Sequence, residues 1–260
     1  MKSINILAIF LLFTFSSFSQ NRNLFEKQWF IKGTDTLPVR ILYPQNMDTH
    51  KKYPVVIFLH GSGERGNDNE AQLVWGADMF LDSMVRSTYP AIVVFPQCTS
   101  KSKWSEYTKS STTDSTGYIW QPDQKILEPL QLVSLYLDSL MKQPNVDTKK
   151  IYVGGLSMGG FATWELLWRK PDVFAAAFPI CGAGDPAKIP MYKHKLPTWI
   201  FHGEKDNVIP VSNSRLFYSI LKQKNRRVKY NEYAGIGHDS WKNAFAEQEF
   251  LPWLFSQKSK

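Results

Sequence analysis

Ser157 stands between two glycines in residues 155–159 (GLSMG), directly after the apolar run 151–153. A serine hydroxyl is a poor nucleophile, and a chain that uses one must lift it onto a strained turn between a strand and a helix. Small residues on either side let such a turn close. The helix that follows would direct its N-terminal amides at a developing oxyanion. The alternative is a glycine-rich turn with an idle serine.

Two candidate partners follow this serine in the sequence. A nucleophilic serine needs a base to accept its proton and an acid to orient that base, and one known arrangement supplies them in the order serine, acid, histidine. Asp206 comes after the apolar run 196–201, and His238 comes after the alternating segment 228–233. Because open parallel sheets bind ligands beyond the carboxyl ends of their strands, we expect these two residues to meet Ser157 at that edge.

Each partner also has a purely structural interpretation. Asp206 is then a turn former, and His238 is a residue at the entry of a helix. Glu204 is the reserve acid. We prefer Asp206, because it lies further into the loop, where a carboxylate can turn back towards the histidine.

A candidate oxyanion hole follows the apolar strand 54–59, which runs into His60, Gly61, Ser62 and Gly63. Two preorganised backbone N–H groups commonly hold the oxyanion of an acyl-transfer reaction. Our candidates are the amides of Ser62 and Met158. Ser62 as a second nucleophile is the alternative, but no strand-serine-helix turn surrounds it. His60 as a base is another, although an anchor beneath the loop is the preferred interpretation.

These segments resemble the α/β-hydrolase superfamily. Within it they are most similar to a secreted esterase group related to carbohydrate esterase family one, the feruloyl esterases and the phospholipase/carboxylesterase-like or "predicted peptidase" proteins. The resemblance runs from about residue 25 to the C-terminus and is carried by residues 58–66 (FLHGSGERG), 95–98 (FPQC), 155–161 (GLSMGGF), 201–206 (FHGEKD) and 235–241 (GIGHDSW). It implies that Ser157, Asp206 and His238 form a catalytic triad. It implies no single substrate, because the group is heterogeneous.

The composition predicts one catalytic domain behind a leader. A chain of 260 residues, 43% of them apolar, can bury a large core, and no repeat or long linker divides residues 20–260. Residues 1–19 combine Lys2, a mostly apolar stretch over 4–15 and a small-x-small site at 17–19, which is typical of a cleaved signal peptide. The apolar stretch is shorter than the roughly 20 residues of a membrane helix. We therefore expect an exported protein, periplasmic or extracellular, without a stable membrane anchor.

The positive charge points to partners that carry negative charge. The formal net charge is +8, and loss of Lys2 with the leader would make it 8 − 1 = +7. A basic exported protein is drawn to acidic polysaccharide or to an anionic surface. The basic residues are scattered along the sequence, and the densest run, 222–227, is expected to be a solvated helix end and turn. We find no nucleic-acid-binding motif and expect no nucleic acid partner.

The two cysteines are expected to remain free. Cys98 and Cys181 each follow a predicted strand. In an α/β-hydrolase sheet the strands that lead to His60 and Ser157 lie between these two, so three strand spacings separate the thiols by roughly 14 Å, beyond the reach of a disulfide. Neither cysteine has the neighbouring ligands of a metal site.

The periodicity of apolar residues predicts an eight-stranded, mainly parallel sheet with helices on both faces, which is the α/β class. The expected strands are residues 28–32, 37–43, 54–59, 91–96, 151–154, 175–180, 198–202 and 228–233. The expected helices are residues 70–85, 123–142, 158–170, 212–224 and 239–257. The expected core of the second helix consists of Leu127, Leu130, Leu135, Leu137 and Leu140.

The loops above the sheet are expected to set specificity. The longest aperiodic stretch covers residues 98–121 and contains several aromatic residues, which either stack on a sugar or phenolic ring or form the private core of an insertion. Glu64 either binds substrate or forms a loop-bracing ion pair with Arg65. The candidate substrate contacts are Glu64, Gln97, Trp104, Trp120 and Trp241.

Together these features predict a secreted serine esterase that works without a metal or an organic cofactor. The expected substrate is a small ester or an esterified polysaccharide, with acyl or feruloyl groups favoured by the resemblance. A peptidase of the prolyl oligopeptidase type is one alternative, although 260 residues leave no room for its propeller domain. A non-catalytic carbohydrate-binding protein on a hydrolase scaffold is the other.

Overall fold

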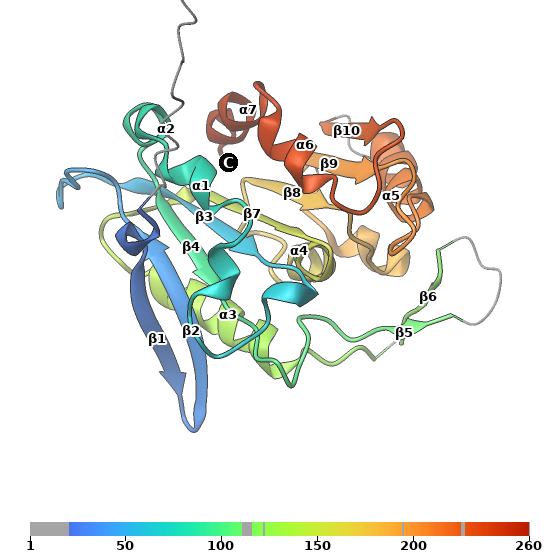
Figure 1. Ribbon diagram of the computed structural model, residues 1–260, viewed down its shortest axis with the longest axis horizontal. Coiled ribbons are helices and arrows are strands. Elements are labelled where there is room, and N and C mark those ends of the chain that lie inside the picture. Colours follow the sequence, from blue (N-terminus) through green and yellow to red (C-terminus); the bar gives the residue numbers. More distant parts are fainter. Residues whose placement is uncertain (1–20, 111–115, 122, 194, 225–226, 260) are drawn as a thin grey trace, which may run out of the picture.

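A computed structural model describes residues 21–110, 116–121, 123–193, 195–224 and 227–259, so the predicted signal peptide lies outside the described residues. Its centre is an eight-stranded sheet in the order β1-β2-β4-β3-β7-β8-β9-β10 (Figure 1). The strands are β1 (Glu26–Lys32), β2 (Asp35–Leu42), β3 (Tyr53–Leu59), β4 (Ile92–Pro96), β7 (Val146–Leu156), β8 (Ala176–Ile180), β9 (Thr198–Gly203) and β10 (Val228–Tyr233). The β1–β2 and β2–β4 pairings are antiparallel, and the other pairings of this sheet are parallel. The expected mainly parallel α/β sheet is confirmed.

Helices cover both faces of this sheet, which accounts for strands that are apolar on both sides (Figure 1). On one face α3 (Glu128–Leu140), α4 (Met158–Arg169) and α5 (Ser212–Lys224) contribute Leu137, Trp164 and Phe217 to the core. On the other face the core includes side chains of α1 (Ala77–Leu81), α6 (Trp241–Ala246) and α7 (Phe250–Ser256). Short 3-10 turns occupy η1 (Arg22–Leu24), η2 (Ser62–Glu64), η3 (Ala71–Leu73) and η4 (Pro186–Met191).

The single helix expected over residues 70–85 is broken into three pieces. Gly76 takes the left-handed conformation, with φ of 84°, between η3 and α1. Asp82 then leaves the helical region and accepts a hydrogen bond from the amide of Val85, which caps a new helix, α2 (Ser83–Thr88). Apolar residues recur at helical spacing through this segment, but the left-handed Gly76 and the capping residue Asp82 each end a helix.

The helix expected over residues 239–257 is likewise two helices, α6 and α7. Pro252 accounts for part of this, because a proline is tolerated in the first turn of α7 but would break a hydrogen bond inside a continuous helix. Glu247 ends α6 in extended conformation, and its carboxylate accepts hydrogen bonds from Asn231 and Tyr233 of β10. These two hydrogen bonds fix the segment between α6 and α7 against β10.

The helix α3 begins at Glu128, later than expected, with Pro129 in its first turn. Of its expected core residues, Leu130, Leu137 and Leu140 are buried, whereas Leu127 and Leu135 are half-buried. The preceding stretch contains a short hairpin that periodicity did not indicate, formed by β5 (Thr108–Lys109) and β6 (Tyr118–Ile119), which extends away from the main sheet in Figure 1.

Both cysteines are buried and free, as predicted, and β3 and β7 lie between the strands that precede them. Within the described part of the chain, none of the helices combines the length and the apolar character needed to cross a bilayer.

Candidate active site

Ser157 occupies a sharp turn between β7 and α4. Its φ of 53° and ψ of −119° are a strained combination for a residue with a side chain, and it occupies the N-cap position of α4 without a capping hydrogen bond from its side chain. The turn packs directly on β3, since a Cβ atom at Gly159 would lie 1.9 Å from the carbonyl oxygen of Leu59. A Cβ at Gly155 would lie 2.5 Å from the carbonyl oxygen of Gly159. Glycine at both positions is therefore what lets the serine project from this edge of the sheet.

The structure brings Ser157, His238 and Asp206 into one hydrogen-bonded line. Nδ1 of His238 lies 2.7 Å from Oδ2 of Asp206, and Nε2 lies 2.9 Å from Oγ of Ser157. The carboxylate can only accept, so Nδ1 carries the proton and Nε2 is free to accept the serine proton. This is the geometry of a serine nucleophile with its base and orienting acid.

The carboxylate of Asp206 is buried and fully hydrogen-bonded. Its Oδ1 accepts from the amides of Val208 and Ile209, both at 2.9 Å, while Oδ2 faces both His238 and His202. Burial of the side chain opposes ionisation, but these hydrogen bonds outweigh it and hold the pKa of Asp206 well below its usual range. A stable anion therefore faces the imidazole of His238.

His202 was not among the expected site residues. Its Nε2 lies 3.1 Å from Oδ2 of Asp206 and 3.0 Å from the carbonyl oxygen of Ile209, while Nδ1 contacts Oγ of Ser214 at 2.7 Å. The ring is completely buried at the end of β9. Only its position at the end of a strand, four residues before Asp206, could have suggested this orienting role from the sequence.

The reserve acid, Glu204, serves a different purpose. It is exposed, and its carboxylate accepts a hydrogen bond of 2.7 Å from the amide of Gly235. It therefore braces the turn that leads to His238, while Asp206 contacts the imidazole.

The loop with Ser62 lies against Ser157. A Cβ at Gly61 would lie 3.6 Å from Cβ of Ser157, so only the width of a methyl group separates the backbone just before Ser62 from the serine. The amide of Met158 is the first of α4, where backbone N–H groups have no partner within the helix. The segments that carry the two expected donors, η2 and the start of α4, therefore come close to the serine, and their role as an oxyanion hole stays a prediction.

His60 anchors this loop from below. The amide of Cys98 donates to its Nε2 at 2.9 Å, so Nδ1 bears the proton and donates to the carbonyl of Gly61 at 2.6 Å. Burial lowers the pKa of His60 to about 4 and keeps the ring neutral. The ring is engaged on both sides, which fits the preferred interpretation of an anchor. Trp104 continues the same support, because its indole N–H donates to the carbonyl of His60 at 3.0 Å.

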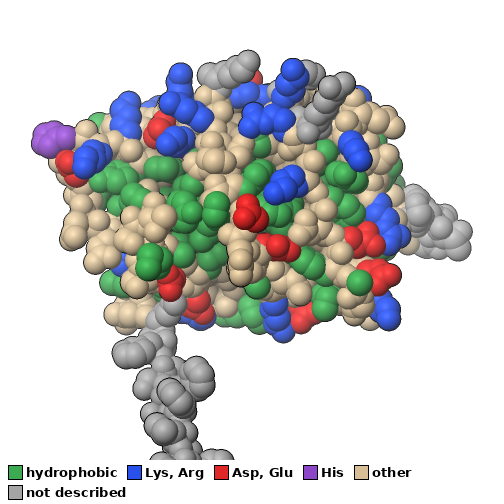
Figure 2. All heavy atoms as spheres, turned by 90° about the horizontal axis from the view of Figure 1, so that it is seen from above, with side chains coloured by type: hydrophobic (Ala, Val, Ile, Leu, Met, Phe, Trp, Pro, Cys, Tyr) green, Lys and Arg blue, Asp and Glu red, His purple; other side chains and the backbone are tan. Residues whose placement is uncertain are grey.

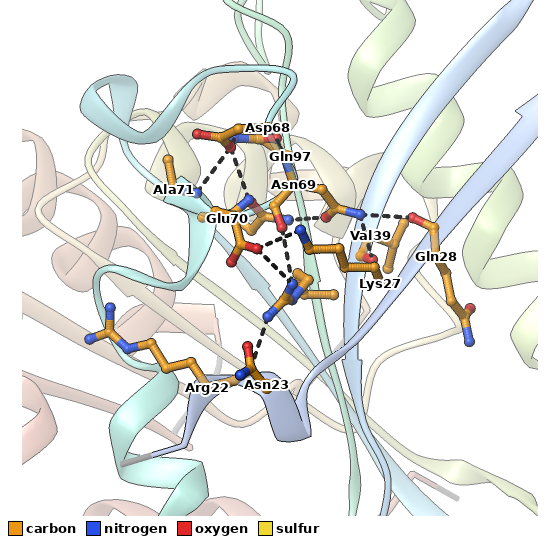
Figure 3. Close-up of polar contacts among 12 residues, drawn as sticks. Arg22, Asn23, Lys27, Gln28, Val39, Asp68, Asn69, Glu70, Ala71 and Gln97 are labelled. Carbon is orange, nitrogen blue, oxygen red and sulfur yellow. Dashed lines mark hydrogen bonds and ion pairs between the residues drawn. The ribbon is translucent and has the colours of Figure 1, made fainter. Parts of the chain in front are cut away.

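A polar network ties residues 68–70, which follow this loop, to the sheet (Figure 3). Gln97 is 1% exposed, and its side chain accepts from the amide of Asn69 and donates to the carboxylate of Asp68. Arg40 reaches the carbonyl of Asn69 and the carboxylate of Glu70 from β2. Gln97 therefore braces the loop from within, in place of the substrate contact expected for it.

Trp104 and Trp120 take different positions. Trp104 is fully buried, so for this residue the private-core alternative holds. Trp120 is half-buried and packs with Tyr107, Tyr118 and Phe161. Phe161 belongs to the first turns of α4, so this aromatic cluster stands beside the helix that begins at Ser157.

Glu64, Trp75 and Trp241 form the other wall of the site. The ring of Trp241 meets the His238 ring edge-on at 5.5 Å and lies 5.6 Å from the ring of Trp75, which sequence reasoning missed. Glu64 forms no ion pair with Arg65, whose guanidinium donates to the carbonyls of Ser62 and Ser102. Burial raises the pKa of Glu64. Oε2 of Glu64 and Nε1 of Trp241 are both buried without a hydrogen-bond partner.

One group of potential metal ligands overlaps this site. Atoms of Cys181, Asp206 and His238 lie within 4.8 Å of one another. Burial raises the pKa of the Cys181 thiol, which keeps it protonated, and the carboxylate and imidazole already bind each other. The donor set is that of a hydrogen-bonded triad with a neutral thiol beside it.

The chain resembles solved esterase structures along most of its length. A thermostable esterase is 35% identical, with a TM-score of 0.81 over 91% of this chain and 64% of that protein. The feruloyl esterase module from Clostridium thermocellum, in a complex with sinapinate, is 16% identical, with a TM-score of 0.62 over 89% of this chain and 88% of that one. At that identity the second likeness shows the fold alone.

Curated relatives match smaller shares of longer proteins. The bifunctional acetylxylan esterase/xylanase XynS20E of Neocallimastix patriciarum is 27% identical over 66% of this chain and 22% of its own length. A probable dipeptidyl-peptidase 5 of Aspergillus terreus is 22% identical over 82% of this chain and 33% of its own. The chain thus spans between a fifth and a third of these relatives.

The sequence profile described as Phospholipase/Carboxylesterase matches residues 46–252, which includes β3, the turn at Ser157 and the loops with Asp206 and His238. The chain therefore belongs to the phospholipase/carboxylesterase family of α/β-hydrolases.

Proposed function

We propose that this chain is an exported serine esterase that removes acyl or feruloyl groups from polysaccharide through a covalent acyl-enzyme. The observation that supports it most is the hydrogen-bonded line from Ser157 through His238 to Asp206, at 2.9 and 2.7 Å. The three residues come from three different loops at the carboxyl edge of the sheet. If the three residues were only turn formers or helix-entry residues, their side chains would not need to meet at one point.

The first half of the reaction forms the acyl-enzyme. Nε2 of His238 takes the proton of the Ser157 hydroxyl as Oγ attacks the ester carbonyl carbon. The positive imidazole then faces the buried anion of Asp206, which stabilises it. As the tetrahedral intermediate collapses, the bond to the alkoxy oxygen breaks and Nε2 returns its proton to the departing alcohol.

In the second half a water molecule takes the place of the alcohol. His238 removes a proton from the water, its oxygen attacks the acyl carbon, and the proton passes to Oγ of Ser157 as the carboxylic acid leaves. The amides of Ser62 and Met158 hold the oxyanion in both halves. Donors of this kind each contribute about 10²–10³-fold to the rate.

The wall of Glu64 and Trp241 supports a sugar as the alcohol. A sugar leaving group carries hydroxyls that both donate and accept, and this wall contains the carboxylate of Glu64 and the indole N–H of Trp241. The rings of Trp75 and Trp241 offer apolar faces next to them. The name of the acetylxylan esterase relative supports the same class of substrate.

The aromatic cluster that includes Trp120 supports a second, apolar subsite for the acyl group. Trp120 and Tyr107 are half-buried at its margin, where a phenolic ring of a feruloyl group would meet them.

The proposal that the protein is exported rests on residues 1–19, which resemble a signal peptide. Cell fractionation with N-terminal sequencing of the mature protein tests it, and a mature chain that begins at Gln20 is the expected result.

Kinetics on purified wild type and Ser157→Ala, with short p-nitrophenyl esters, test the catalytic proposal. The variant is expected to lose about 10⁴-fold or more in kcat, with an unchanged circular dichroism spectrum. Equal activity in both proteins would remove Ser157 from the mechanism. A product screen on feruloylated and acetylated glycans, with peptide p-nitroanilides as the comparison, then identifies the substrate; preferential cleavage of the anilides would favour a peptidase.

A further inference from the structure

Basic residues that are scattered in the sequence gather at the edge of the sheet opposite the candidate active site. The parallel strands β3, β7, β8, β9 and β10 all point the same way, so the segments before them meet at one edge. Lys52 precedes β3, Lys195 precedes β9 and Arg227 precedes β10, while Lys150 lies in β7 just before its run of parallel pairing with β3 and β8. We call this set, together with Lys51, Lys149, Lys193 and Lys258, the basic edge.

Few acidic groups balance this edge. Asp48 pairs with Lys51 at 3.7 Å, the carboxylate of Asp147 accepts from the backbone amide of Lys149, and Asp172 is exposed in the segment before β8. Among the residues that the structure describes, Lys52, Lys150 and Lys195 form no ion pair. In Figure 2 the Lys and Arg side chains gather along the upper edge of the view, with apolar side chains beside them.

A groove of about 680 Å³ opens between the lysines at one end of the basic edge. Lys52 and Lys150 stand at its sides, and Pro90 and Pro252 contribute apolar walls. Its rings are those of Tyr89 and Phe255, which stack in parallel with centroids 4.9 Å apart. This volume is in the range of sites that hold an organic ligand.

A second, smaller groove of about 270 Å³ lies further along and is lined by Lys193, Lys195 and Lys258. The segment 256–259 runs from the first groove, which Ser256 lines, to the second, which Ser259 lines, and the amide of Ser259 donates to the carbonyl of Lys149 at 2.8 Å. The basic edge therefore offers ammonium groups at intervals along an extended, partly apolar path.

We propose that the basic edge binds an acidic polysaccharide, a chain of uronic acid residues, at a site separate from the ester-cleaving one. Pyranose rings have apolar C–H faces that fit flat rings and prolines, while their carboxylates recur along the chain and pair with successive ammonium groups. A neutral glycan would leave the lysines unpaired. A flat lipid surface would leave the groove empty.

This site goes beyond the proposed esterase activity and does not depend on it. The basic edge and the Ser157 loop lie at opposite ends of the parallel strands. A bound polyanion would hold the protein on its matrix and leave the candidate active site open. The site can therefore be tested with a polymer that carries no ester.

Binding of fully de-esterified polygalacturonate, measured by affinity electrophoresis and titration calorimetry on the mature protein, tests the proposal. The wild type is expected to bind it and not dextran. Lys52→Glu with Lys150→Glu is expected to weaken binding about tenfold or more, since each basic group near an anionic surface contributes on the order of 1 kcal/mol. Tyr89→Ala is expected to weaken it several-fold without any change of charge.

Lys32→Glu with Lys125→Glu is the matched control, because both lysines are exposed away from the basic edge and the net charge changes equally. Retained affinity in this control, with loss in the first pair, supports the site. Equal loss in both pairs, or no binding by the wild type, overturns it. Equally tight binding to phosphatidylglycerol vesicles or duplex DNA, or unchanged affinity in Tyr89→Ala, would show that the edge senses charge alone and would overturn the assignment to a polysaccharide.

Discussion

At the scale of single residues, the site depends on one carboxylate that accepts four N–H donors. Oδ1 of Asp206 accepts from two backbone amides, and Oδ2 faces the ring nitrogens of two imidazoles. Both positions of the side chain must therefore carry an oxygen atom that can accept. Asp206 and His238 could be predicted as site residues because each follows a predicted strand. The role of His202 could not be predicted from the sequence. A histidine at the end of a buried strand looks the same in the sequence whether its ring only packs in the core or also orients an acid.

The substitution Asp206→Asn is expected to lower kcat about 10⁴-fold with little change in KM. An amide has one acceptor oxygen, so its NH₂ group must face either the two backbone amides or the two imidazoles. Facing the imidazoles, it turns the His238 ring to the wrong tautomer. Steady-state kinetics on p-nitrophenyl acetate would measure this, with circular dichroism as the check on folding; a loss below tenfold would contradict the role assigned to Asp206.

His60 predicts a pH dependence of stability. In the folded chain burial lowers its pKa to about 4, whereas an unfolded histidine has a pKa of about 6.5. Between these values the unfolded chain binds a proton that the folded chain does not, so the free energy of unfolding falls as the pH falls through this window. The full effect is about 3 kcal/mol, reached near pH 4.

Urea titrations from pH 7 to pH 4 on wild type and His60→Gln would measure it. A glutamine can accept from the amide of Cys98 and donate to the carbonyl of Gly61, as the imidazole does, but it does not titrate. The variant is expected to show a flatter dependence in this range. Parallel curves for both proteins would mean that His60 does not account for the change.

At the scale of elements, the strand-turn-helix around Ser157 works because α4 is pressed onto β3. Gly159→Ala would place a methyl group 1.9 Å from the carbonyl oxygen of Leu59, and neither backbone can move away easily. We expect a loss of about 3 kcal/mol or more in the free energy of unfolding, which is about 6–12 °C in Tm for a domain of this size. Thermal unfolding followed by circular dichroism checks this.

The matched control is Gly63→Ala, where an added Cβ meets nothing within 4 Å and φ is not positive. Its Tm is expected to stay within about 2 °C of the wild type. Should Gly159→Ala be as stable as Gly63→Ala, the close approach of α4 to β3 would not be what fixes the turn.

Most elements were predictable, because most of the parallel strands contain a short apolar run, β10 alternates between apolar and polar residues, and α4 and α5 have regular spacing. The errors share a physical cause. Gly76 and Asp82 end helices by backbone conformation and capping, which leave the apolar period intact. The burial of Trp104 and Gln97 was not predictable either, since it depends on a loop that folds back over His60 and Asp68.

At the scale of the whole molecule, sheet order decides what distant residues can do together. The predicted order placed Cys98 and Cys181 on strands separated by two others, and the structure agrees. The same order gathers scattered lysines into the basic edge, which a reading of the linear sequence missed, because the loops concerned are far apart in the chain.

Thiol titration tests this arrangement of strands. The two cysteines are both 0% exposed and unpaired. We expect no reaction with Ellman's reagent in the native state and two equivalents in guanidinium, with a Tm that reductant does not change. Absence of both equivalents after unfolding would reveal a disulfide and contradict the separation of the two strands.

The central claim is that the hydroxyl at position 157 is a nucleophile activated by His238. Reaction with a fluorophosphonate, followed by peptide mapping in a mass spectrometer, tests it most directly. One adduct per chain on Ser157, at a rate that falls at least about a hundredfold in His238→Ala, is the predicted result. Labelling at Ser62 instead, or labelling of Ser157 at an unchanged rate in His238→Ala, would contradict the account.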